Sequence, residues 1–143
     1  MTGTLTATLD PSASDEPGVT LRIANDGGEA VEILDPDVGR PPPEMGWPWS
    51  VAAYRVAVLL SFGYLALVVT DGAGDPVEPE PVQPWATPVL RPPVVLGPGD
   101  VVAVPLPLVP FFPLAAGATY RVAVDYGVAP ATVHAEGAVI PPA

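Results

Sequence analysis

The sequence predicts an all-β domain, a two-layer sandwich of about seven to nine short strands with proline-rich loops. Three observations predict it. Valine dominates the aliphatic residues, with 22 Val against 13 Leu and 3 Ile, and β-branched side chains suit a pleated strand better than a helix. Apolar and polar residues alternate over several short stretches. Proline and glycine, 22 and 14 of the 143 residues, separate these stretches and mark turns.

The composition is that of one folded domain over residues 1–143. Hydrophobic residues make up 49% and charged residues only 15%, whereas disordered chains show the opposite balance. The chain has no cysteine, which excludes disulfides, thiolate nucleophiles and Cys-ligated metals. The first residues contain neither a basic segment nor an apolar one. The default expectation is therefore a cytoplasmic protein, or an extracellular one if a leader was removed.

The net charge of −11 bears on the kind of partner. Five scattered arginines and no lysine cannot follow a phosphate backbone, so nucleic acid is not expected. An anionic membrane surface is also disfavoured. The charge could steer a basic partner, although acids that solvate a very apolar chain are the simpler explanation.

The N-terminal part predicts a strand and a hairpin. Apolar residues alternate with threonine over residues 5–9, which indicates a half-buried strand. The same alternation continues through residues 18–34 around a turn at 25–28, Asn-Asp-Gly-Gly. Asn and Gly tolerate positive φ at low cost. Residues 18–34 therefore read as a hairpin.

A long proline-rich loop is predicted over residues 35–49, because proline removes backbone donors and fixes φ. The loop carries Met45, Trp47 and Trp49. A loop with such apolar side chains either lies back across the edge of the core or meets a partner.

Residues 51–69 are apolar, with Arg55 as the only charge. The uninterrupted part, 56–69, is shorter than the roughly 20 residues of a membrane span, so a membrane helix is not expected. We expect two buried strands, or one long strand bulged near Gly63. A short buried helix over 50–60 is the alternative.

The rest of the chain alternates short apolar stretches with turns at 71–75 and 97–100. Residues 76–93 are studded with proline and should be extended. Pro105 and Pro107 cannot donate to a ladder, which predicts an edge strand there or a strand whose end is unpaired. The further strands expected are 64–70, 101–108, 120–126 and 133–139, and the apolar residues 94–96 lead into the second of these turns.

Leu114, Gly117 and Tyr120 precede and open the strand at 120–126. A tyrosine at such a strand entry can fold back over the loop that the chain has just left. Its hydroxyl can then bond the upstream backbone, as in a tyrosine corner.

The pattern L-x-x-G-x-x-Y at 114–120 resembles the immunoglobulin-like and fibronectin type III superfamily. LGPGDVVAVPLPL at 96–108 and VHAEGAV at 133–139 are similar to the C-terminal half of bacterial Ig-like domains. The resemblance covers about 45 residues well and departs at 40–62, where the Trp-rich loop and apolar run have no counterpart. It implies an Ig-like sandwich, a fold that hosts adhesion, scaffolding, inhibition and non-catalytic enzyme appendages.

Catalytic and metal chemistry find little support in the sequence. His134 is the only histidine; Ser50 or Ser61 could complete a triad in space, but a surface or cross-strand histidine is the simpler interpretation. One histidine without cysteine makes zinc implausible, and the acidic turn at 71–75 is only a faint calcium candidate. We expect no enzyme activity, metal or cofactor.

Loop aromatics are the candidate partner-binding residues, since aromatic side chains often anchor interfaces. They could instead plug the open ends of the sandwich. The leading hypothesis is a non-enzymatic Ig-like module that binds a protein partner or its own copies through these aromatics and an edge strand. A mean hydropathy of +0.40, high for a monomer, favours it. The alternatives are a protease inhibitor that presents loop 35–49 and an accessory domain of an enzyme. The candidate residues are Trp47, Trp49, Trp85, Phe111 and Phe112.

Overall fold

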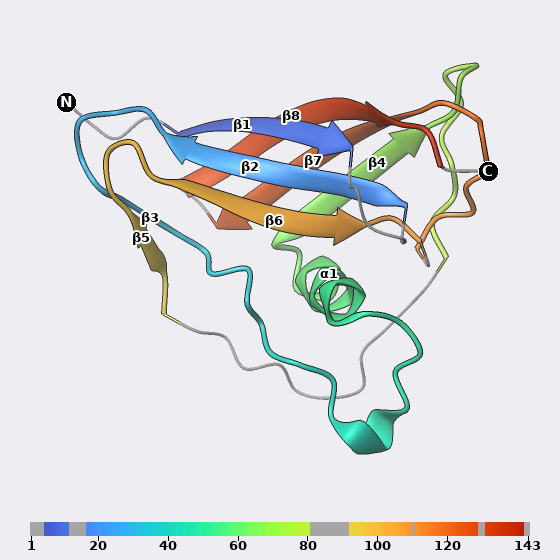
Figure 1. Ribbon diagram of the computed structural model, residues 1–143, viewed down its shortest axis with the longest axis horizontal. Helices are drawn as coiled ribbons and strands as arrows, with labels where there is room; N and C mark the ends of the chain where they lie inside the picture. The colour runs from blue at the N-terminus through green and yellow to red at the C-terminus, as the bar shows by residue number, and fades with distance from the viewer. Residues whose placement is uncertain (1–4, 12–16, 81–91, 110, 129–130, 142–143) are drawn as a thin grey trace.

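A computed structural model describes residues 5–11, 17–80, 92–109, 111–128 and 131–141 (Figure 1). Strands dominate these residues, which confirms the all-β class. The elements are β1 (Leu5–Pro11), β2 (Gly18–Asn25), β3 (Val31–Ile33), the 3-10 helix η1 (Pro43–Met45), α1 (Val51–Ser61), β4 (Leu65–Thr70), β5 (Val94–Leu96), β6 (Val101–Pro107), β7 (Tyr120–Val128) and β8 (Ala131–Val139).

The described strands form two main antiparallel sheets and one small sheet. One main sheet has the order β1-β2-β6 and the other β4-β7-β8. The short strands β3 and β5 pair apart from both, as a two-stranded sheet. The predicted two layers are therefore accompanied by a third, minor pairing.

The two main sheets meet along β1 and β8 (Figure 1). Gly137 makes this approach possible, because a Cβ there would lie 2.8 Å from the Cβ of Leu9. The sheets diverge toward β6 and β4, and α1 packs against both of these outer strands. The helix thus closes the open side of the sandwich.

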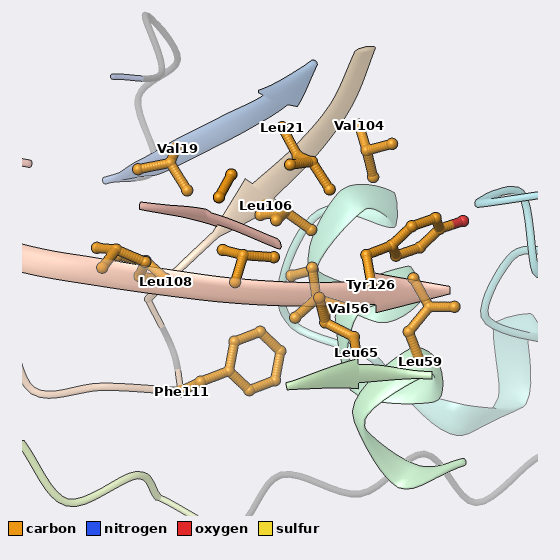
Figure 2. Packing of buried hydrophobic residues seen from close by; sticks show 14 of the residues in the cluster. Val19, Leu21, Val56, Leu59, Leu65, Val104, Leu106, Leu108, Phe111 and Tyr126 are labelled. Carbon is orange, nitrogen blue, oxygen red and sulfur yellow. The ribbon is translucent and has the colours of Figure 1, made fainter. Parts of the chain in front are cut away.

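The core lies between the sheets and α1 (Figure 2). Side chains from β2, β4, β6, β7 and α1 point into one interior, and Phe111 fills one end of it. The period of two explains the strand contributions, because alternate residues face inward. The residues labelled there are Val19, Leu21, Val56, Leu59, Leu65, Val104, Leu106, Leu108, Phe111 and Tyr126.

The hairpin predicted over residues 18–34 is wrong in its pairing, although both strands and the turn form. β2 is flanked by β1 and β6, so β3 has no free edge of β2 to join and pairs with β5 instead. Asn25 holds the chain in a turn that leads away from β2. Its buried amide donates to the carbonyls of Glu29 and Leu96, and its Oδ1 accepts from Gly27 N–H. These bonds connect the end of β2 to β5.

Residues 51–69 are not two strands or one bulged strand, as the leading interpretation held. The alternative, a short buried helix, forms as α1, and the strand expected at 64–70 follows it as β4. The Oγ of Ser50 caps the helix by accepting from Ala53 N–H, 3.0 Å away. Among the described residues, no helix has both the length and the apolar character needed to cross a membrane.

β6 is an edge strand among the described residues, as predicted. Leu108 N–H donates to Pro17 O and Asn25 N–H to Asp100 O, so these opposed pairs are hydrogen-bonded. Alternation of the ladder then directs the backbone groups of every second residue, including Pro105 and Pro107, toward the free edge. The two prolines therefore remove two outward donors.

Candidate functional site

The loop aromatics Trp47 and Trp49 form a cluster at the N-terminus of α1. Their ring centroids are 5.0 Å apart at an interplanar angle of 75°. Trp47 also packs edge-on against the buried ring of Tyr54, at 5.6 Å, and its Nε1 donates to Ser50 O at 3.0 Å. Trp49 remains 39% exposed. One tryptophan thus forms a fixed base on which the other is presented to solvent.

The preceding part of the loop is held by Arg55 on α1. Its Nη2 lies 3.0 Å from an Asp37 carboxylate oxygen, and its Nε donates to Gly39 O at 3.3 Å. Asp37 Oδ1 also accepts from Gly39 N–H. Val38 between them is buried. The loop is therefore attached to the helix near both of its ends.

A groove of about 100 Å³ lies between α1, the start of this loop and β6. Its walls are mostly apolar, with the Arg55–Asp37 pair at one side. The groove has room for one aliphatic or proline side chain rather than for a large ligand. The lining residues are Pro36, Asp37, Ala52, Arg55, Val56, Leu59, Ala103, Val104, Pro105 and Leu106.

The predicted partner-binding aromatics do not form one surface. Phe111 and Phe112 are 2% and 4% exposed, so they plug the core, the other role foreseen for loop aromatics, and cannot anchor a partner in this conformation. Trp85 lies outside the described residues. Trp47 and Trp49 remain together as the aromatic candidates.

Tyr120 is buried and folded back over its preceding loop. Its hydroxyl oxygen accepts a hydrogen bond from Ala115 N–H at 2.7 Å. Gly117 has φ +78°, a conformation that favours glycine, and its N–H donates to Pro141 O. Leu114 is half-buried against the core. This arrangement fixes the loop between β6 and β7.

His134 is exposed on β8, opposite Asp125 on β7. Its Nδ1 lies 2.8 Å from an Asp125 oxygen and its Nε2 lies 3.3 Å from a Glu136 oxygen. The hydrogen bond with Asp125, then that with Glu136, raises the pKa of the imidazole above 6.5. Both ring nitrogens thus face carboxylates rather than a serine.

The two serines considered for a triad have local partners in α1. Ser50 Oγ caps the helix, and Ser61 Oγ donates to Ala57 O at 2.8 Å. In the acidic turn, Asp71 Oδ1 accepts from the N–H groups of Ala73 and Asp75. Within the described ranges, no group of three or more His, Cys, Asp or Glu side chains is arranged to hold a metal ion.

Comparisons with protein-family models and with curated proteins found no match to this chain.

Sequence reasoning missed the groove and the roles of Tyr54 and Arg55. Both residues act through α1, and the spacing of Ser50 and Tyr54, four positions apart, places them on one face only in a helix. A helical interpretation of 50–60 would have brought Tyr54 next to the Trp-rich loop. No local signal identifies β6 as the opposite wall.

Proposed function

We propose that the protein is a non-enzymatic interaction module of the immunoglobulin-like type, which binds a protein partner through the Trp47–Trp49 cluster. The single observation that carries the proposal is Trp49, an exposed aromatic on a fixed base. Interface hot spots are enriched in tryptophan, and a pre-organised anchor loses little freedom on binding.

The strand order supports the Ig-like part of the proposal. β1, β2 and β6 share one sheet and β4, β7 and β8 the other. Strands A, B, E and C, F, G divide in the same way in Ig-like sandwiches. The Tyr120 hydrogen bond at the entry to β7 corresponds in place to their tyrosine corner. The fold by itself specifies no activity.

Affinity capture from the source organism, followed by titration with the identified protein, tests the proposal. Trp49→Ala should weaken binding by roughly 30-fold, the loss typical of a hot spot of about 2 kcal/mol. Val101→Ala is the matched control, because Val101 is also exposed and apolar but lies on β6. A partner that binds both variants as tightly as the native chain would refute the assignment.

A second candidate is a protease inhibitor that presents loop 35–49. The observation that favours it is the attachment of this loop to α1 through Arg55 and Ser50, with Pro42 extended at φ −65° and ψ 145°. Such a loop is pre-organised for an extended binding site. Incubation with a protease panel tests it: inhibition lost on replacement of residues 40–46 supports it, and cleavage without inhibition excludes it.

A further inference from the structure

The free edges of the two main sheets differ in their capacity to accept another strand. Within the described ranges these edges are β6 and β4, because β1 and β8 lie against each other. Proline blocks two outward positions of β6. β4 contains no proline and no charged residue, and neither kind of residue occurs anywhere from residue 56 to 70. The end of this edge at Thr70 is bridged by Pro76, but the stretch from Leu65 to Val68 has no such protection and is a template for strand addition.

The hydrogen bonds of β4 identify its outward positions. Gly127 N–H donates to Tyr64 O, so this opposed pair is hydrogen-bonded. Alternation along the ladder directs the backbone groups of Leu65, Leu67 and Val69 away from β7. Val69 O already accepts from Val77 N–H. No other described backbone group bonds to Leu65 and Leu67 on that side, so both still offer an N–H and a C=O.

We propose that a second copy of the chain binds this edge, with β4 and its partner's β4 antiparallel about a two-fold axis. In one register the outward residues Leu65 and Leu67 of both copies are paired. Leu65 of each chain then lies opposite Leu67 of the other chain. This register forms four backbone hydrogen bonds and places Ala66 opposite its own equivalent. It joins the two β4-β7-β8 sheets into one.

The side chains beside β4 fit this register. Val68, 55% exposed, would lie opposite Tyr64 of the other copy on the outer face, and Phe62, 48% exposed, stacks on Tyr64 at 6.0 Å. Aromatic and β-branched residues form favourable cross-strand pairs. Ala66 is small and leaves the axis unobstructed. The β4 edges of two copies are therefore complementary to each other. A charged strand added at this edge would instead leave its charge buried and unpaired.

The inference goes beyond the proposed function and is independent of Trp49. Light scattering after size exclusion should give the native chain twice its mass of 14.6 kDa. Ala66→Lys should give a monomer, because two like charges would meet at the axis. Ala138→Lys, on the same sheet face but on β8, should remain a dimer.

Cysteine cross-linking tests the register, since the native chain has no cysteine. In a non-hydrogen-bonded pair the Cα atoms lie about 4.5 Å apart, within the range of about 4.4–6.8 Å for disulfides. Ala66→Cys should therefore form a linked dimer roughly ten-fold or more faster than Ala138→Cys, because the pairing holds its thiols together.

Three results would overturn the inference: a native monomer at every concentration, equal cross-linking of the two cysteine variants, or a dimer that survives Ala66→Lys. Val68→Lys provides a second disruption at an exposed position if Ala66→Lys fails to fold. The β4 dimer and the Trp49 partner surface can fail separately. Partner binding that persists in the monomeric variants and is lost in Trp49→Ala would show that the partner surface does not depend on the dimer.

Discussion

A few side-chain hydrogen bonds fix the ends of loops in this protein. Tyr120 holds the loop before β7 through Ala115 N–H, and Asn25 holds the turn after β2 through three bonds. Buried polar groups need such partners, because an unmade bond costs the desolvation of the group. Among the described residues, every buried side-chain nitrogen or oxygen has a partner. At this scale the fold depends on a few satisfied polar atoms.

Tyr120→Phe should lower the free energy of unfolding by about 1 kcal/mol, because the ring stays buried while Ala115 N–H loses its acceptor. Urea unfolding measures the change. Tyr64→Phe is the control, since the described contacts of Tyr64 include ring stacking but no bond of its hydroxyl. Equal midpoints for Tyr120→Phe and the native chain would show that the bond contributes nothing.

His134 should titrate with a pKa above 6.5, because Asp125 and Glu136 favour the imidazolium. Its folded pKa is raised, so its contribution to stability is fully present below pH 6.5 and is lost as the pH rises through the raised value. NMR titration reads the single histidine directly.

Asp125→Asn should bring the pKa of His134 down toward its ordinary value. Correspondingly, His134→Gln should reduce stability more at pH 6 than at pH 9. A pKa at or below 6.5 in the native chain would contradict the geometry of the carboxylates.

At the scale of elements, α1 is the piece that distinguishes this chain from a plain sandwich. It closes the side between β4 and β6 and carries the residues that hold loop 35–49. A short helix is marginal by itself and depends on its cap and on packing. The start of α1 should therefore be a sensitive position.

Ser50→Ala should destabilise the protein by about 1 kcal/mol, the usual cost of losing an N-cap. Ser61→Ala, at the exposed end of the same helix, should be nearly neutral, because its hydroxyl bonds back to Ala57 O. Chemical denaturation of both variants measures the contrast. Equal effects would argue that the cap is dispensable.

Elements with a clear period of two were predictable from the sequence. β1, β7 and β8 follow their alternation of apolar and polar residues. The helix α1 was not predictable from the sequence. Its apolar run is buried on nearly all sides, so the pattern of apolar residues shows neither the period of a helix nor that of a strand. The turn at Asn25 was recognised, but the partner of β2 depends on strands far along the chain.

For the molecule as a whole, the candidate site was only half predictable. Two tryptophans in a loop are a visible signal, and Trp47 and Trp49 do lie together. Phe111 and Phe112 have the same local appearance, yet they are buried because the loop after β6 passes over the open end of the core. Burial is a property of the complete fold, which loop composition cannot reveal.

The prolines of β6 limit how far copies of this molecule can associate. A β4 edge that met β6 of another copy head to tail would leave a free β4 and a free β6 at the ends, and growth could continue into a fibril. Pro105 and Pro107 have no backbone N–H, so such a contact would lack two of its hydrogen-bond donors. In the proposed dimer each copy would use its own β4 edge, so the assembly would end at two chains.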